Sequence, residues 1–318
     1  MQPFRPLIRH PHLLTIAASL WPRRLDTRRF PVEEKLFESE PGVRVLVQVQ
    51  RPTGSCRGGL VLVHGLEGSS SAGYMKSMAQ AALQAGFAAH RFNLRNCGDA
   101  ERLAPTIYNA GQTCDLLAYL ESVKRGAGAP LFLVGFSLGG NIALKLAGEL
   151  GNGGGDLLAG VCAASAPIDL GESCRQLSLR HNHLYERRFV GSMRRRIRAM
   201  NRLHPGFFPE TELDGIRTLY DFDDRVTAPL SGFRDAGHYY STQSAIGFLE
   251  RIRVPTLLIQ AQDDPMIPFE IYGRPAVADD PLVELIAAGH GGHLGFLSRS
   301  RPRFWLDGTV IAWMKRKS

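Results

Sequence analysis

Residues 131–150 read LFLVGFSLGGNIALKLAGEL, and this stretch predicts the fold. The apolar run Leu131–Phe136 predicts a buried strand, and Leu138–Leu150 carries apolar side chains at helical spacing. Between them GFSLG at positions 135–139 is a G-x-S-x-G sequence, placed where a strand turns into a helix. An ordinary glycine-rich turn is the simpler interpretation. The strand–turn–helix context favours a nucleophile elbow, which makes Ser137 the candidate nucleophile.

Strands and helices alternate along most of the remaining chain. Further strands are predicted over residues 43–50, 59–63, 87–92, 161–164, 256–260 and 282–288, and further helices over 74–84, 111–123 and 304–314. This alternation predicts an α/β fold, with a mostly parallel sheet covered by helices on both faces. Residues of about 170–250 show no convincing strand, so we expect a helical cap insertion within a single domain spanning 1–318. The glycine-rich residues 151–155 predict a loop.

The composition is that of a folded globular chain. It has 318 residues, of which 44% are hydrophobic and 21% charged. The chain has no apolar run of about 18 residues, so no membrane-spanning helix is expected. The apolar stretch 13–21 resembles the core of a signal peptide, but Arg23 and Arg24 follow it and no A-x-A cleavage site is visible.

The net charge of +8 raises the question of a polyanionic partner. Nine arginines fall between Arg175 and Arg202, and from Phe189 to Leu203 apolar residues recur in steps of three and four. A surface helix with a solvated basic face is the favoured interpretation. A patch that attracts anionic substrates or lipid headgroups is an alternative. The chain has no nucleic-acid-binding motif, so no nucleic-acid partner is expected.

The five cysteines are odd in number, widely spaced and without a C-x-x-C pair. This spacing favours reduced thiols over disulfide bonds or a zinc site. We therefore expect a cytoplasmic protein.

A serine hydroxyl needs a base, and the base needs an acid that orients it. Asp264 follows the strand predicted at 256–260 and is the candidate acid; Asp263 beside it and Asp169 after an earlier strand are alternatives. The loop after the strand at 282–288 offers His290 and His293 as bases. These positions alone do not choose between the two histidines. The pair His290 and His293 could ligate a metal, but the sequence offers no third ligand at the spacing that a zinc site needs. No metal is therefore expected.

An oxyanion hole needs two backbone N–H groups aimed at the developing charge. The N–H of Leu138, directly after the nucleophile, is one candidate. The N–H of Leu66, in the loop after the strand at 59–63, is the other. We expect His64 to hold the shape of that loop and Glu67 to face away from the oxyanion.

Several motifs resemble the YheT-type branch of the α/β-hydrolase superfamily, which also includes animal α/β-hydrolase-domain esterases and lipases. The matching sequences are PHL at 11–13, HGLEGS at 64–69, GFSLGGN at 135–141, DDP at 263–265 and GGHLGF at 291–296. The sequence RNCG at 95–98 departs from the branch's pattern at Asn96, and His238 departs from it further along. The GGHLGF match selects His293 over His290 as the triad base.

The resemblance implies the α/β-hydrolase fold and a serine esterase or lipase that cleaves carboxylic esters through an acyl-enzyme. Its expected substrates are small esters with short or medium acyl chains, acylglycerols among them, with no metal or organic cofactor. The basic cap helix would permit peripheral contact with a lipid surface. An acyltransferase using the same triad, and a basic binding protein with a vestigial site, are the alternatives.

Overall fold

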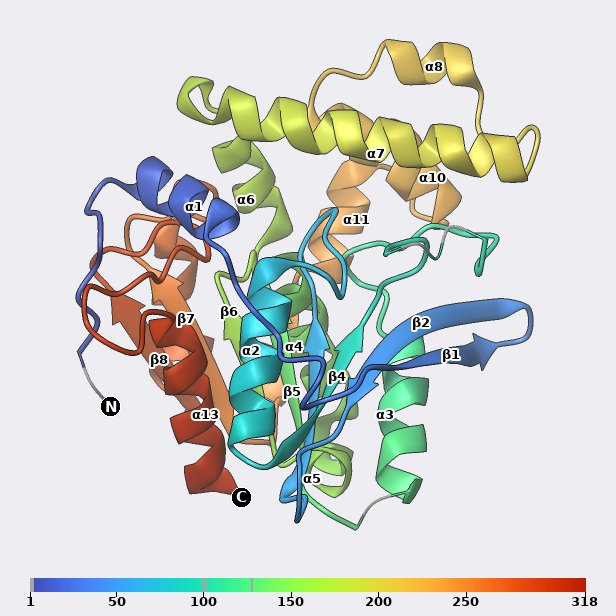
Figure 1. Ribbon diagram of the computed structural model, residues 1–318. Helices are drawn as coiled ribbons and strands as arrows, with labels where there is room; N and C mark the ends of the chain where they lie inside the picture. Colours follow the sequence, from blue (N-terminus) through green and yellow to red (C-terminus); the bar gives the residue numbers. More distant parts are fainter. Residues whose placement is uncertain (1–2, 99, 101, 127) are drawn as a thin grey trace.

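The computed structural model describes residues 3–98, 100, 102–126 and 128–318. Eight strands form one sheet in the order β1-β2-β4-β3-β5-β6-β7-β8 (Figure 1). The strands are β1 (Glu33–Glu40), β2 (Val43–Gln50), β3 (Gly58–Val63), β4 (Phe87–Phe92), β5 (Leu131–Phe136), β6 (Gly160–Ala164), β7 (Thr256–Ala261) and β8 (Val283–Ala288). Only the pairs β1–β2 and β2–β4 are antiparallel. The predicted α/β fold with a mostly parallel sheet is confirmed.

Helices cover both faces of this sheet, because its central strands are apolar on both sides. Along β3, Leu60 and Leu62 pack on one face with α2 (Gly73–Gln84) and α13 (Trp305–Lys317). Val61 and Val63 pack on the other face with α3 (Cys114–Gly126) and α4 (Leu138–Leu150). Successive side chains of a strand point to opposite faces, so a continuous apolar run predicts a strand that is covered twice.

Three regions differ from the sequence-based expectation. The edge strand β1 escaped prediction because its sequence EEKLFESE is mostly charged and its side chains face solvent. Helix α1 (Pro11–Leu20) forms where the sequence suggested only an apolar stretch. The expected loop at 151–155 is a helical turn over Gly151–Gly153 followed by α5 (Gly154–Leu157). Burial of Leu157 stabilises this turn, which its glycines do not predict.

The segment between β6 and β7 consists of helices joined by turns and contains no strand. It contains α6 (Leu170–Leu177), α7 (His183–Leu203), α8 (Glu210–Asp214), α9 (Leu219–Phe222), α10 (Ala228–Leu230) and α11 (Ala236–Gln243). Helices α7 and α8 lie above the sheet in Figure 1. Side chains of α7 such as Met193 and Met200 share a separate apolar cluster with Phe222. Across the described parts of the chain, no helix combines the length and apolarity needed to cross a membrane.

Candidate active site

Ser137 sits at the tight turn between β5 and α4. Its φ of 51° and ψ of −123° lie outside the regions that a serine normally occupies, so the surrounding structure must enforce them. Glycines make this turn possible. A Cβ atom on Gly135 would lie 2.1 Å from the carbonyl oxygen of Gly139, and one on Gly139 would lie 2.4 Å from that of Val63. The spacing of G-x-S-x-G is therefore a steric requirement of the turn.

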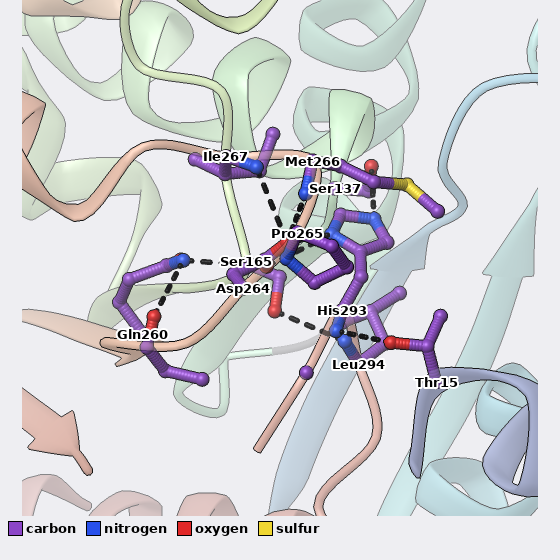
Figure 2. A network of polar contacts seen from close by, with 12 residues as sticks. Thr15, Ser137, Ser165, Gln260, Asp264, Pro265, Met266, Ile267, His293 and Leu294 are labelled. Carbon is purple, nitrogen blue, oxygen red and sulfur yellow. Dashed lines mark hydrogen bonds and ion pairs between the residues drawn. The ribbon is translucent and has the colours of Figure 1, made fainter. Parts of the chain in front are cut away.

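The structure brings Ser137, His293 and Asp264 together (Figure 2). The Nε2 atom of His293 lies 3.0 Å from Oγ of Ser137. The Nδ1 atom of His293 lies 2.9 Å from Oδ2 of Asp264 and 3.2 Å from Oδ1. The His293 side chain is 10% exposed and that of Asp264 is 0% exposed. An acceptor at Nδ1 places the imidazole proton there, which leaves Nε2 free to accept the hydroxyl proton of Ser137.

Backbone donors hold the carboxylate of Asp264 in place. Its Oδ1 accepts the N–H groups of Met266, at 2.9 Å, and Ile267, at 3.2 Å. Its Oδ2 accepts from Nε2 of Gln260 at 3.3 Å. Asp264 follows the carboxyl end of β7, the edge where parallel sheets place their sites.

The alternative acids and base make other contacts. Nδ1 of His290 lies 3.1 Å from Oδ2 of Asp263, and Oδ1 of Asp263 accepts the N–H of Gly292 at 2.9 Å. The Asp169 side chain accepts the N–H of Glu172 and caps the start of α6. Asp263 and His290 thus form a second pair beside the Ser137 site, and Asp169 has a helix-capping role.

Leu66 and Leu138 line the same pocket as Ser137 and His293, as the oxyanion-hole hypothesis requires. The loop that carries Leu66 is fixed by buried side chains. Nδ1 of His64 lies 2.8 Å from the carbonyl oxygen of Gly65, and its Nε2 accepts the N–H of Leu94 at 3.1 Å. Burial lowers the pKa of His64 to about 4, so its ring is neutral at neutral pH. These contacts agree with the loop-holding role expected for His64.

A buried ion pair joins this loop to helix α7. Arg196 Nη2 pairs with Oε1 of Glu67; the two side chains are 8% and 11% exposed. The guanidinium lies 4.2 Å from the ring centroid of Tyr108, whose hydroxyl donates to Glu67 Oε1 at 3.1 Å. Arg196 is therefore not part of the solvated basic face expected for this helix. Its position three residues after Met193 and four before Met200 places it within the apolar stripe.

Replacing Arg196 by methionine is expected to destabilise the protein by about 3–5 kcal/mol, because Glu67 would keep a buried charge without its partner. Urea unfolding of the variant measures this loss. Arg195→Met is the matched control, since Arg195 is exposed on the same helix and should change stability by no more than about 0.5 kcal/mol. Equal losses in the two variants would show that the ion pair contributes nothing specific.

The pocket over Ser137 is mainly apolar, and the segment between β6 and β7 supplies much of its wall. Apolar side chains from this segment are Leu170, Leu177, Phe189, Met193, Leu219 and Phe222. Phe189 and Met193 of α7 line this pocket, whereas Met200 is fully buried in the separate cluster. Asp223 is a polar residue of the pocket wall. Its carboxyl group accepts hydrogen bonds from the hydroxyls of Thr227 and Tyr240, and burial raises its pKa to about 6.

Sequence reasoning missed the contribution of helix α1. Oγ1 of Thr15 accepts the backbone N–H of His293 at 2.8 Å (Figure 2) and donates its own proton to the carbonyl oxygen of Pro11. This contact joins residues 278 positions apart in the chain. The only available signal was the PHL sequence at 11–13, close to Thr15. This sequence belongs to the family resemblance but carried no structural role there.

Comparisons with known proteins identify the family to which this chain belongs. The sequence model of the alpha/beta hydrolase family matches residues 60–305. A putative esterase, YheT of Escherichia coli, is 33% identical over 80% of this chain and 76% of its own length. A monoacylglycerol lipase of Saccharomyces cerevisiae is 28% identical over 80% of this chain but only 58% of its own length.

A solved structure of the Pyrococcus furiosus esterase Pf2001 superposes with a TM-score of 0.61 at 17% identity. The match covers 93% of this chain and 98% of that one, which shows a shared fold. The family match spans well over half of the chain, and the resemblance to the YheT-type branch is confirmed. This chain therefore belongs to the alpha/beta hydrolase family, in the branch that contains YheT.

Proposed function

We propose that the protein is a serine hydrolase that cleaves carboxylic esters through an acyl-enzyme. The observation that carries this proposal is the hydrogen-bonded series Ser137–His293–Asp264 at the base of an apolar pocket. The names of its relatives, a putative esterase and a monoacylglycerol lipase, support the same class of reaction.

In the acylation step, Nε2 of His293 takes the hydroxyl proton of Ser137 while Oγ attacks the ester carbonyl carbon. The carbonyl oxygen gains negative charge and is stabilised by the N–H groups of Leu66 and Leu138. Leu138 is the first residue of α4, so the positive end of that helix faces the same charge. The bond to the leaving oxygen then breaks, and the imidazolium of His293 protonates the departing alcohol.

Water completes the cycle. It enters where the alcohol left, gives a proton to Nε2 of His293 and attacks the acyl carbon. Collapse of the second tetrahedral intermediate breaks the bond to Oγ and releases the carboxylic acid, while His293 returns the proton to Ser137. Asp264 stabilises the imidazolium in both half-reactions and stays ionised.

The pocket favours esters with an apolar acyl group. We propose short or medium acyl chains, with acylglycerols among the substrates, held between the core and the helices over 170–250, which act as a cap on a single domain. The wall combines Phe189, Met193 and Leu219 of the cap with Met266 and Ile267 of the loop after β7. Such a wall excludes water from the reacting carbonyl and binds methylene groups. We place the protein in the cytoplasm on the basis of its cysteine spacing.

A fluorophosphonate probe tests the function directly. The reagent phosphonylates an activated serine, so we expect one label per chain, found by mass spectrometry on the peptide that contains Ser137. The Ser137→Ala variant serves as the control and should remain unlabelled. A folded wild-type protein without label would support a vestigial binding site. If added alcohol captured most of the acyl group in place of water, the protein would be an acyltransferase.

Shortening Met193 is expected to change the preferred acyl length. Met193→Ala enlarges the pocket by about two methylene groups, so the ratio of kcat/KM for octanoyl over butyryl p-nitrophenyl esters should rise roughly tenfold. Met200→Ala is the matched control on the same helix. Met200 is buried outside the pocket, so its loss should cost about 2–5 kcal/mol of stability without changing the ratio. An unchanged ratio in Met193→Ala would mean that acyl chains bind elsewhere.

A further inference from the structure

Large exposed apolar side chains gather at one corner of the molecule. Of the eight that are exposed among the described residues, six lie on or beside α1 and the start of α7. This α1–α7 patch consists of Leu13, Ile16, Leu20, Trp21, Leu179 and Leu184. Leu20 is 77% exposed and Leu184 is 83% exposed. Single exposed apolar residues are ordinary, but a cluster of this kind marks an interaction surface.

Ring contacts place the two parts of the patch side by side. His12 of α1 stacks on Tyr185 of α7, with ring centroids 5.7 Å apart and an interplanar angle of 11°. The same histidine ring contacts that of His181 at 5.8 Å. Figure 1 shows α1 beneath the end of α7 from which the chain enters that helix. The start of α1 therefore lies against the start of α7, so the exposed apolar side chains of the two helices lie on neighbouring parts of the surface.

Helix α1 is amphipathic and already seated on the body of the protein. Its inner face buries Leu14 and Ala18, which pack with Leu297. Its outer face carries Leu13, Ile16 and Leu20, spaced three and four residues apart. The apolar outer face is thus not needed for packing within this chain. Each of its large side chains would gain about 1.5–3 kcal/mol on transfer from water into an apolar phase.

The surroundings of the patch are cationic. Exposed arginines flank both helices, namely Arg9, Arg24, Arg180, Arg187 and Arg188. The first acidic residue of the chain is Asp26. Glu186 is the only acidic residue between positions 179 and 188, and it is buried, accepting from Ser178 Oγ and from the N–H of Leu219. An apolar centre with a positive rim matches a bilayer whose headgroups are negative.

We propose that the α1–α7 patch docks the protein on the surface of a bilayer that contains anionic lipids. Helix α1 has ten residues and is about 15 Å long, too short to span the hydrocarbon core. It lies along the interface, with Leu13, Ile16 and Leu20 among the acyl chains and the arginines at the headgroups.

This docking would bring lipid close to the catalytic residues. Thr15, on the inner face of α1, holds the backbone of His293. Leu177 of α6 and Phe189 of α7 line the pocket, while Leu179 lies just beyond the end of α6 and Leu184 lies in the first turn of α7. Docking rests on the exposed surface alone, whereas delivery of a lipid ester to Ser137 also rests on the proposed function.

Co-sedimentation with sucrose-loaded vesicles tests the proposal. Wild-type protein should bind vesicles of one part phosphatidylglycerol to three parts phosphatidylcholine, and bind pure phosphatidylcholine at least several-fold more weakly. The double variant Ile16→Ser/Leu20→Ser should bind the mixed vesicles at least roughly tenfold more weakly. Leu36→Ser is the matched control, because Leu36 is 53% exposed but lies on β1, outside the α1–α7 patch. This variant should bind vesicles like wild type. Circular dichroism checks that all variants are folded.

Equal binding by wild type and the double variant, or no binding by wild type, would overturn the proposal. Sedimentation velocity tests the other occupant. If the wild-type protein were a dimer and the double variant a monomer, the patch would bind a second copy of the chain, and the docking proposal would be overturned. Two controls separate docking from catalysis. Ser137→Ala should bind vesicles like wild type, and the double variant should hydrolyse soluble p-nitrophenyl acetate like wild type. If the wild-type protein bound vesicles but hydrolysed no ester, only the proposed function would be rejected.

Discussion

Replacing Ser137 by alanine is expected to lower kcat for ester hydrolysis by roughly 10⁴–10⁶. The variant has no oxygen to form the acyl-enzyme, so His293 can only activate water against a carbonyl placed for a different nucleophile. The residual rate comes from the N–H groups of Leu66 and Leu138 and from substrate binding. Hydrolysis of p-nitrophenyl butyrate by purified protein measures the loss. KM should change little, because the pocket wall remains intact.

Ser173→Ala is the control for this experiment. Ser173 also lines the pocket and is buried, but its hydroxyl donates to the carbonyl oxygen of Asp169, the residue that caps the start of α6. Its removal should change kcat by less than about threefold, since the net contribution of one such hydrogen bond is about 1 kcal/mol, mostly to stability. If the Ser137→Ala variant kept near-normal turnover, the proposed mechanism would be wrong in its first step.

The central strands and the helix after the nucleophile could be predicted from sequence because each carries a local signal. Strand β5 and helix α4 begin and end at the predicted residues, since a buried apolar run and a helical apolar stripe meet at a glycine-flanked turn. Strand β1 carries no such signal. Its charged residues tolerate an edge position, and pairing with β2, which contacts it from Glu33 to Glu40, holds it in place.

Candidate catalytic residues could be named from sequence because they follow the carboxyl ends of predicted strands. The choice of Asp264 over Asp263 depended on position alone, and the structure now shows a distinct hydrogen-bond partner for each. Side chains that act across the chain were beyond reach. Thr15 contacts the loop of His293 through the docking of α1, and Arg196 meets Glu67 through the packing of α7 on the core. The position of Arg196 within the apolar stripe indicates its burial, but no sequence pattern identifies Glu67 or His293 as the partner of either side chain.

The amide variant Asp264→Asn is expected to lower kcat by roughly 10⁴ while leaving the fold in place. Oδ1 of Asp264 accepts the N–H groups of Met266 and Ile267, so the amide oxygen must take that position. The amide nitrogen then replaces Oδ2 and faces Nδ1 of His293, where the carboxylate oxygen lay at 2.9 Å. An N–H donor there forces the imidazole proton onto Nε2, so the ring can no longer accept the proton of Ser137.

The same geometry explains why stability should change little in Asp264→Asn. Nε2 of Gln260 donates to Oδ2 of Asp264, and its Oε1 is buried without a hydrogen-bond partner among the described residues. Rotation of the Gln260 amide by half a turn presents that oxygen to the new amide nitrogen, and it breaks the hydrogen bond that Nε2 donates to the carbonyl oxygen of Ala261 at 3.2 Å. We therefore expect a free energy of unfolding within about 1 kcal/mol of the wild-type value, measured by urea denaturation. A loss of activity at unchanged stability then reports on the histidine tautomer.

Asp263→Asn provides the matched comparison for this prediction. Asp263 carries the same charge one residue earlier, but its partners are the half-exposed ring of His290 and the N–H of Gly292. Its amide variant keeps an oxygen for Gly292 and should lower kcat by less than about tenfold. If Asp263→Asn instead proved the more damaging of the two, the acid of the triad would be Asp263, and the loop after β7 would have to rearrange when substrate binds.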